Sequence, residues 1–168
     1  MNSIKGILDK SDYEGYFDFL NFQIDGYWLD EKLEELYPDY SIKDNIPTLL
    51  FALESEKEQE IVWDRILPKE NETTVCPILM CPDDCDFICT LIVAEIENCG
   101  STIRWNKIGF DMTKSNLPEK VGSKVDWFNN FNFLEFESSQ YSIMISEFKK
   151  HYALDKLRFE NIANKNEK

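Results

Sequence analysis

Five cysteines fall within one stretch of the chain, and their thiols are the groups best suited to bind a metal ion: Cys76, Cys81, Cys85, Cys89 and Cys99. Structural zinc sites usually use two pairs of cysteines or histidines, each pair closely spaced in the sequence. Cys81 and Cys85 flank a predicted turn, whereas Cys85 and Cys89 would share one face of an extended strand, roughly 13 Å apart. The spacing therefore predicts no metal site and no cofactor. It favours small buried side chains, with a redox or disulfide role as the alternative.

Three carboxylates follow Pro82, namely Asp83, Asp84 and Asp86. Carboxylates can bind calcium or magnesium, but a calcium loop alternates its oxygen ligands and closes with a glutamate. This stretch lacks that pattern. The cluster is therefore interpreted as a polar turn or as an acidic surface that faces a partner. A small metal-dependent enzyme that uses these carboxylates is a further alternative.

Nucleophilic catalysis would have to involve His151, because it is the chain's one histidine. A Ser-His-Asp or Cys-His arrangement needs a histidine as its base. The sequence contains no G-x-S-x-G, no P-loop and no G-x-G-x-x-G motif. We therefore expect a protein that is not an enzyme, with His151 at the surface or half-buried.

Residues 74–110 predict the sheet that positions the cysteines and the acidic cluster. Apolar residues fill both alternating sets of positions in 86–97, which is typical of a strand covered on both faces. With 74–80 and 101–110, this segment predicts three antiparallel strands. Proline, aspartate, asparagine and glycine supply the two connecting turns. The β-branched residues of the three segments favour strands over a helix.

The N-terminal segment has a weaker pattern. Residues 1–15 are polar and predict a loosely ordered lead-in. Residues 16–24 predict a strand, but their aromatic and aliphatic side chains change parity along it. A bulge near Leu20 and Asn21 would reconcile the two parities. Asp25-Gly26 is a turn signal.

A short helix is predicted over 31–37, with Asp30 as its N-cap. Its apolar residues, Leu33, Leu36 and Tyr37, are expected to face the core. Three carboxylates are expected to face water: Glu31, Glu34 and Glu35. These three carboxylates form a second acidic cluster.

Further helices and strands follow. Ser55 and Glu58 have the capping-box spacing and predict a helix over about 56–66. Residues 131–137 predict a strand, and 140–160 the longest helix. We expect 162–168 to form a frayed tail. The long helix has one apolar stripe, formed by Tyr141, Met144, Ile145, Phe148 and Tyr152.

This order of elements predicts an α+β protein. We expect an antiparallel sheet of about four to five strands with helices packed on it and a long C-terminal helix. At 168 residues, the chain is most simply one domain, 1–168. A hydrophobic fraction of 43% suits a packed core.

The chain is strongly acidic, with a formal net charge of −14. Nucleic acids and anionic membranes are therefore not expected as partners, because phosphate binding needs a basic surface. The N-terminal sequence lacks a secretory signal, and no apolar run reaches the roughly 18 residues of a membrane helix. We expect a cytoplasmic protein whose cysteines are thiols.

Residues 46–112 resemble immunity proteins of bacterial polymorphic-toxin and contact-dependent inhibition systems. The resemblance rests on the segments VWDRILP, CPDDCDF, CTLIVAEIE and IRWNKIGFD. It implies a small, cytoplasmic, non-catalytic protein that binds and blocks one cognate toxin domain. Immunity families have unrelated folds, so the resemblance implies no particular fold.

The expected function is therefore neutralisation of a basic toxin domain, for example a nuclease. The acidic surface would attract such a partner. The predicted partner-binding residues are the two acidic clusters, Glu31, Glu34 and Glu35 with Asp83, Asp84 and Asp86. An acidic adaptor or structural domain with an unrelated partner is the main alternative.

Overall fold

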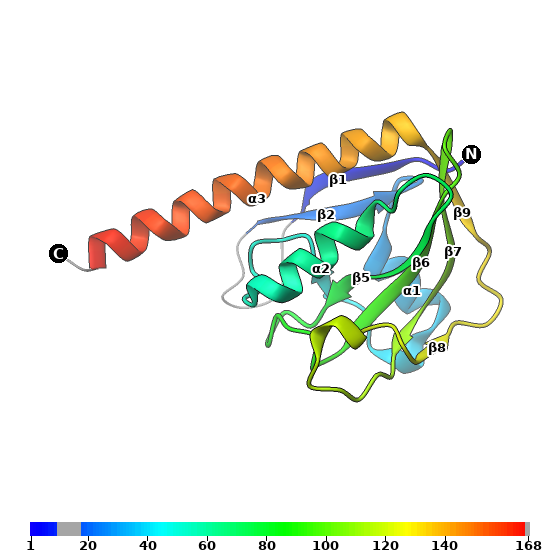
Figure 1. Cartoon of the computed structure of the whole chain (residues 1–168), viewed down its shortest axis with the longest axis horizontal. Coiled ribbons are helices and arrows are strands. Elements are labelled where there is room, and N and C mark those ends of the chain that lie inside the picture. Colours follow the sequence, from blue (N-terminus) through cyan, green and yellow to red (C-terminus); the bar gives the residue numbers. More distant parts are fainter. Residues whose placement is uncertain (10–17, 167–168) are drawn as a thin grey trace.

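The structure is a computed structural model that describes residues 1–9 and 18–166. Within these ranges, two antiparallel sheets and three α-helices build the fold (Figure 1), so the predicted α+β class is confirmed. The strands are β1 Ile4–Asp9, β2 Phe19–Ile24, β3 Tyr27–Trp28, β4 Ile46–Pro47, β5 Thr73–Met80, β6 Leu91–Asn98, β7 Thr102–Asp111, β8 Val125–Trp127 and β9 Leu134–Glu137. The helices are α1 Leu29–Leu36, α2 Glu56–Ile66 and α3 Ser138–Asn166, with 3-10 turns η1 Pro38–Tyr40 and η2 Pro118–Lys120.

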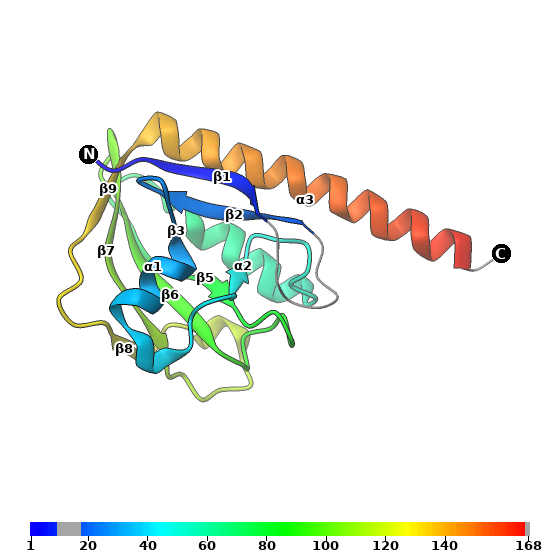
Figure 2. The same cartoon turned by 180° about the vertical axis from the view of Figure 1, so that it is seen from behind.

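The larger sheet has the order β4-β5-β6-β7-β8, and β9 also pairs with β7. β6 lies at its centre, and its residues 91–94 and Ile96 are all buried. Helix α2 covers one face of the sheet, and α1 lies on the other (Figures 1 and 2). A strand buried on both faces is therefore confirmed, although it begins later than predicted.

The predicted strand 86–97 is wrong over residues 86–90, which form a loop before β6. The carboxylate of Asp86 explains the difference, because it accepts hydrogen bonds from the backbone N–H groups of Ile88 at 2.9 Å and Cys89 at 3.2 Å. Such local bonds give the backbone an alternative to pairing in a sheet. Ile88, expected inside the sheet, is 92% exposed.

The N-terminal lead-in is a second correction. Residues 4–9 form β1, which pairs with β2 along its whole length without a register shift. The bulge at Leu20 and Asn21 is therefore wrong, and both residues are buried because β2 has side chains packed on each face. Residues 10–17, which include the start of the predicted strand 16–24, lie outside the described residues.

Helix α1 begins two residues earlier than predicted, with Trp28 as its N-cap and no side-chain cap. Asp30 lies inside the helix and is buried. Its carboxylate accepts hydrogen bonds from the side chain of Asn21 at 3.3 Å and the backbone N–H of Asp44 at 3.0 Å. Asp30 therefore joins β2 to the loop after α1 instead of capping the helix. Leu36, expected to face the core, is 51% exposed.

Helix α2 begins as predicted, because the hydroxyl of Ser55 accepts a hydrogen bond from the backbone N–H of Glu58 at 3.3 Å.

The predicted strand 131–137 is shorter, since β9 starts at Leu134. Helix α3 directly follows it and is longer than predicted. Its stripe is confirmed for Tyr141, Met144, Ile145 and Phe148, which are buried, whereas Tyr152 at its end is half-buried.

The C-terminal part of α3 extends beyond the rest of the fold (Figure 1). Residues 162–166, predicted as part of a frayed tail, are helical, whereas 167–168 lie outside the described residues. Several good helix formers lie in this part of the helix, namely Lys149, Lys150, Leu154, Lys156, Leu157 and Arg158. The helix therefore continues where side chains from the core no longer contact it.

A buried polar network joins three elements of the core. The hydroxyl of Tyr141 on α3 accepts a hydrogen bond from Nε1 of Trp105 on β7 at 3.2 Å. It donates one to the carbonyl of Ile66, the last residue of α2, at 2.7 Å. Both aromatic side chains are fully buried. Burial raises the pKa of Tyr141, so its hydroxyl keeps the proton that the Ile66 carbonyl receives.

Truncating a buried side chain on either face of β6 should destabilise the protein. Leu91 and Ile92 point to opposite faces and are 1% and 0% exposed. Leu91→Ala and Ile92→Ala should each lower the free energy of unfolding by roughly 2–5 kcal/mol, because both leave cavities. Urea denaturation measures the change. A nearly neutral result for one variant would mean that its face of the sheet is not packed.

Removing the Tyr141 hydroxyl should destabilise the protein without leaving a large cavity. Tyr141→Phe leaves the Trp105 N–H and the Ile66 carbonyl without this partner, so a loss of about 1–3 kcal/mol is expected. Tyr27→Phe is the control, because Tyr27 is 59% exposed. Equal effects of the two substitutions in thermal or urea unfolding would contradict this role of the network.

Candidate functional site

The β5–β6 loop, residues 81–90, has its backbone held by hydrogen bonds. Cys81 N–H donates to the carbonyl of Thr90 at 3.1 Å, which closes the loop at its base. Cys85 N–H donates to the carbonyl of Cys81 at 3.0 Å, and Cys85 has a positive φ of 49°. With the two bonds that Asp86 accepts, these contacts give the loop one defined conformation.

A buried carboxylate from another element also holds this loop. Oε1 of Glu58 on α2 accepts a hydrogen bond from the backbone N–H of Phe87 at 2.9 Å, and Glu58 is only 7% exposed. Burial raises the pKa of Glu58, and the charge of nearby Asp86 raises it further, whereas the bond from Phe87 opposes the shift. Glu58 therefore ties the loop to α2 by a group that is costly to ionise.

The loop presents one apolar side chain and two acidic side chains to solvent. Ile88 is 92% exposed, and Asp83 and Asp84 are exposed as predicted. Asp86 is half-buried and binds the loop's own backbone. The predicted acidic cluster is thus divided between two exposed carboxylates and one that shapes the loop.

The acidic cluster on α1 is divided in the same way. Glu31 and Glu35 are exposed, and Glu35 lies 3.7 Å from the amine of Lys32. Oε2 of Glu34 accepts hydrogen bonds from the backbone N–H groups of Ile42 and Lys43 and is part-buried. Helix α1 and the β5–β6 loop lie on different parts of the molecule (Figures 1 and 2). The structure therefore does not join the two clusters into one surface.

A groove with a volume of about 690 Å³ borders the loop. Its aromatic lining comes from Phe51 before α2 and from Tyr152 and Phe159 on α3, with Phe51 lying 5.4 Å from each of the other two rings. Its charged lining is mainly acidic, with one lysine: Glu54, Glu56, Asp83, Glu160 and Lys156. The sequence did not indicate this groove, because its walls come from three separate segments.

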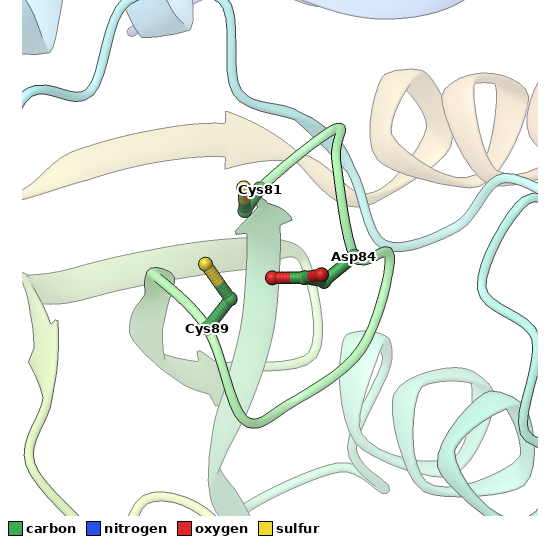
Figure 3. Close-up of side chains that lie close together, drawn as sticks. All are labelled: Cys81, Asp84 and Cys89. Atoms are coloured by element: carbon green, nitrogen blue, oxygen red, sulfur yellow. The ribbon is translucent and has the colours of Figure 1, made fainter.

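Two thiols and a carboxylate gather at the base of the loop (Figure 3). Ligand atoms of Cys81, Asp84 and Cys89 all lie within 4.8 Å of one another. The spacing argument against a metal site assumed that the segment before Cys89 was an extended strand, and this assumption is wrong because 86–90 turn back toward β5. These three residues could hold a metal ion.

The cysteines have three different environments. Cys76 and Cys85 are buried, as predicted, whereas Cys81 and Cys89 are half-buried and Cys99 is exposed. Burial raises the pKa of Cys89 to about 11, and a hydrogen bond with Cys81 adds to the shift. At neutral pH, the thiol of Cys89 therefore stays protonated unless a cation binds it.

His151 lies on α3 and is half-buried, as predicted. Its Nδ1 is 3.4 Å from Oδ2 of Asp155, one helical turn later. Arg158 also approaches this carboxylate, at 4.0 Å. The contacts of Asp155 thus run along one face of the helix, which is a common arrangement for stabilising an exposed helix.

The comparisons with known proteins identify no relative. No family model matches the sequence, no curated protein matches it significantly, and no solved structure has a significantly similar fold. Among the described residues, none of the helices combines the length and apolar character that crossing a membrane requires.

Glu58 should make stability depend on pH. Because its folded pKa is raised, the folded protein holds this proton more tightly than the unfolded chain. The contribution of Glu58 to stability therefore falls as pH rises through the raised pKa. Glu58→Gln keeps an oxygen for Phe87 but cannot ionise, so it should gain stability relative to the unsubstituted protein as pH rises from acidic to neutral.

Urea unfolding at a series of pH values measures this difference. Glu60→Gln is the matched control, because Glu60 is exposed on the same helix. Glu58→Ala, which also removes the acceptor, should speed hydrogen exchange of the Phe87 amide. A constant stability difference between the protein and Glu58→Gln at all pH values would contradict the assignment.

Proposed function

We propose that this chain is a cytoplasmic immunity protein that binds and blocks a basic toxin domain through the β5–β6 loop. The observation that carries the proposal is Ile88, which is 92% exposed at the surface of a loop fixed by hydrogen bonds. A large apolar side chain held in this way is suited to insert into a pocket of a partner. The resemblance of residues 46–112 to immunity proteins specifies the class of partner.

Preorganisation supports binding at this loop. Burying an isoleucine side chain contributes about 1.5–3 kcal/mol. Part of that gain is usually lost when a flexible loop becomes ordered on binding. Here Glu58 and Asp86 already fix the backbone N–H groups of Phe87, Ile88 and Cys89, so little ordering cost remains. Ile88 can therefore act as an anchor residue.

Charge supports a basic partner. The chain has a net charge of −14, and Asp83 and Asp84 are exposed on the loop that carries Ile88. The adjacent groove adds the carboxylates of Glu54, Glu56 and Glu160. Exposed carboxylates accelerate association with a cationic surface and disfavour acidic partners. Nucleases need such cationic surfaces to bind phosphate, so an acidic inhibitor can occupy the same area.

The β5–β6 loop is a better candidate than α1. Glu34 binds the backbone of the following loop, and Glu35 lies next to Lys32, which partly neutralises it. Glu31 is the remaining carboxylate of that predicted cluster. Two exposed carboxylates and an exposed isoleucine on the same loop provide both of the contributions that a specific interface needs.

An acidic adaptor with a different basic partner would use the same chemistry, so the test must identify the partner. The chain is co-expressed with the toxin domain encoded by the neighbouring gene. We expect protection of the cells and a 1:1 complex whose association rate falls as salt concentration rises. A neighbouring toxin domain that neither binds the chain nor is neutralised by it would contradict the immunity function.

Variants locate the interface. Ile88→Ala should weaken the complex by about 10–100-fold, mainly through faster dissociation. Asp83→Lys should mainly slow association. Glu31→Lys with Glu35→Lys is the matched control, since it reverses exposed charges on α1. If the control weakens binding and the loop variants do not, the toxin binds α1 and the loop is not the interface.

A further inference from the structure

We propose that Cys81, Asp84 and Cys89 form a zinc site that closes the base of the β5–β6 loop. Cys81 directly follows β5, Asp84 lies in the turn, and Cys89 precedes β6. The carboxylate of Asp84 extends toward the thiol of Cys89 (Figure 3). This inference concerns the chain alone and does not depend on a toxin partner.

The separations suit a tetrahedral ion. With zinc–sulfur bonds of about 2.3 Å and zinc–oxygen bonds of about 2.1 Å, neighbouring ligand atoms lie about 3.5–3.8 Å apart. The Sγ and carboxylate oxygen atoms here already lie within 4.8 Å of one another. Small side-chain rotations, without rearrangement of the backbone, would bring them to these separations.

Asp83 contacts Cys81 alone and lies outside the group of mutually close ligand atoms. Its Oδ2 lies 3.9 Å from Sγ of Cys81. A structural site has four protein ligands, whereas a site with three protein ligands completes its coordination with water. Three protein donors, two sulfur atoms and one oxygen atom, are therefore within reach of one ion, and water would complete the coordination.

The donor types select the metal. Thiolates favour zinc over magnesium and calcium, which prefer oxygen ligands only. Binding requires both thiols to release their protons to solvent.

Hydrogen bonds already hold the backbone of the loop near the proposed ligands. The bond between Cys81 N–H and the Thr90 carbonyl holds the two ends of the loop together, and Asp86 fixes the backbone N–H of Cys89. Much of the entropy cost of assembling the ligands is therefore met before the metal binds. A bound ion would in turn hold Ile88, which is next to Cys89 in the chain.

Cobalt(II) is the probe, because cobalt–thiolate bonds give charge-transfer absorption that carboxylate sites lack. The full chain is reduced, freed of metal and titrated with cobalt under anaerobic conditions. We expect one cobalt ion per chain with thiolate charge-transfer bands, and its displacement by zinc. Zinc should also raise the melting temperature, because it binds the folded state.

Substitutions test the ligands. Cys81→Ser and Cys89→Ser should abolish the charge-transfer bands and the zinc-dependent rise in melting temperature. Asp84→Asn should weaken binding by at least about 10-fold while keeping the bands, as expected for an oxygen ligand. Cys99→Ser and Asp39→Asn are matched controls at exposed positions elsewhere, and both should bind one ion.

Circular dichroism without metal verifies that every variant is folded. Absence of cobalt–thiolate bands from the reduced protein would overturn the proposal. So would bands that persist in both serine variants, or bands lost in Cys99→Ser.

Discussion

The hydroxyl group of Tyr141 is the contact on which the arrangement of the core depends. It connects β7, α2 and α3 through bonds to Trp105 and Ile66 in a region without exposed surface. Apolar packing can tolerate small shifts of a helix, whereas a buried donor and acceptor can be satisfied only in a narrow range of positions. The network therefore fixes where α2 ends, and with it the position from which Glu58 reaches the β5–β6 loop.

The elements that sequence analysis located well are those with a repeating local signal. The stripe on α3 and the Ser55 cap of α2 depend on residues a few positions apart, so they could be read directly. Two of the errors have tertiary causes. The sequence pattern of β1 is weak, and this strand is fixed by pairing with β2. Asp30 is buried because its carboxylate accepts hydrogen bonds from Asn21 and from the backbone of Asp44. At Asp86, local bonds to the backbone prevailed over an apolar run.

The candidate site was predicted only in part, for the same reason. Acidic residues around Asp83 stand out in the sequence, and two of the three are exposed. Whether a carboxylate faces solvent or binds backbone depends on the neighbouring chain, as Glu34 shows by accepting bonds from the segment after α1. The approach of Cys81 to Cys89 requires the intervening residues to turn back, which spacing alone does not reveal.

Helix α3 has a further consequence for how the protein unfolds. Phe148 is buried against Phe22, with the rings 5.0 Å apart, so this part of the helix can open only when the core opens. Residues 160–166 are exposed and have mainly their own helical hydrogen bonds. One continuous helix thus spans two cooperative units, a terminal part that frays with a small free energy and an inner part that opens only with global unfolding.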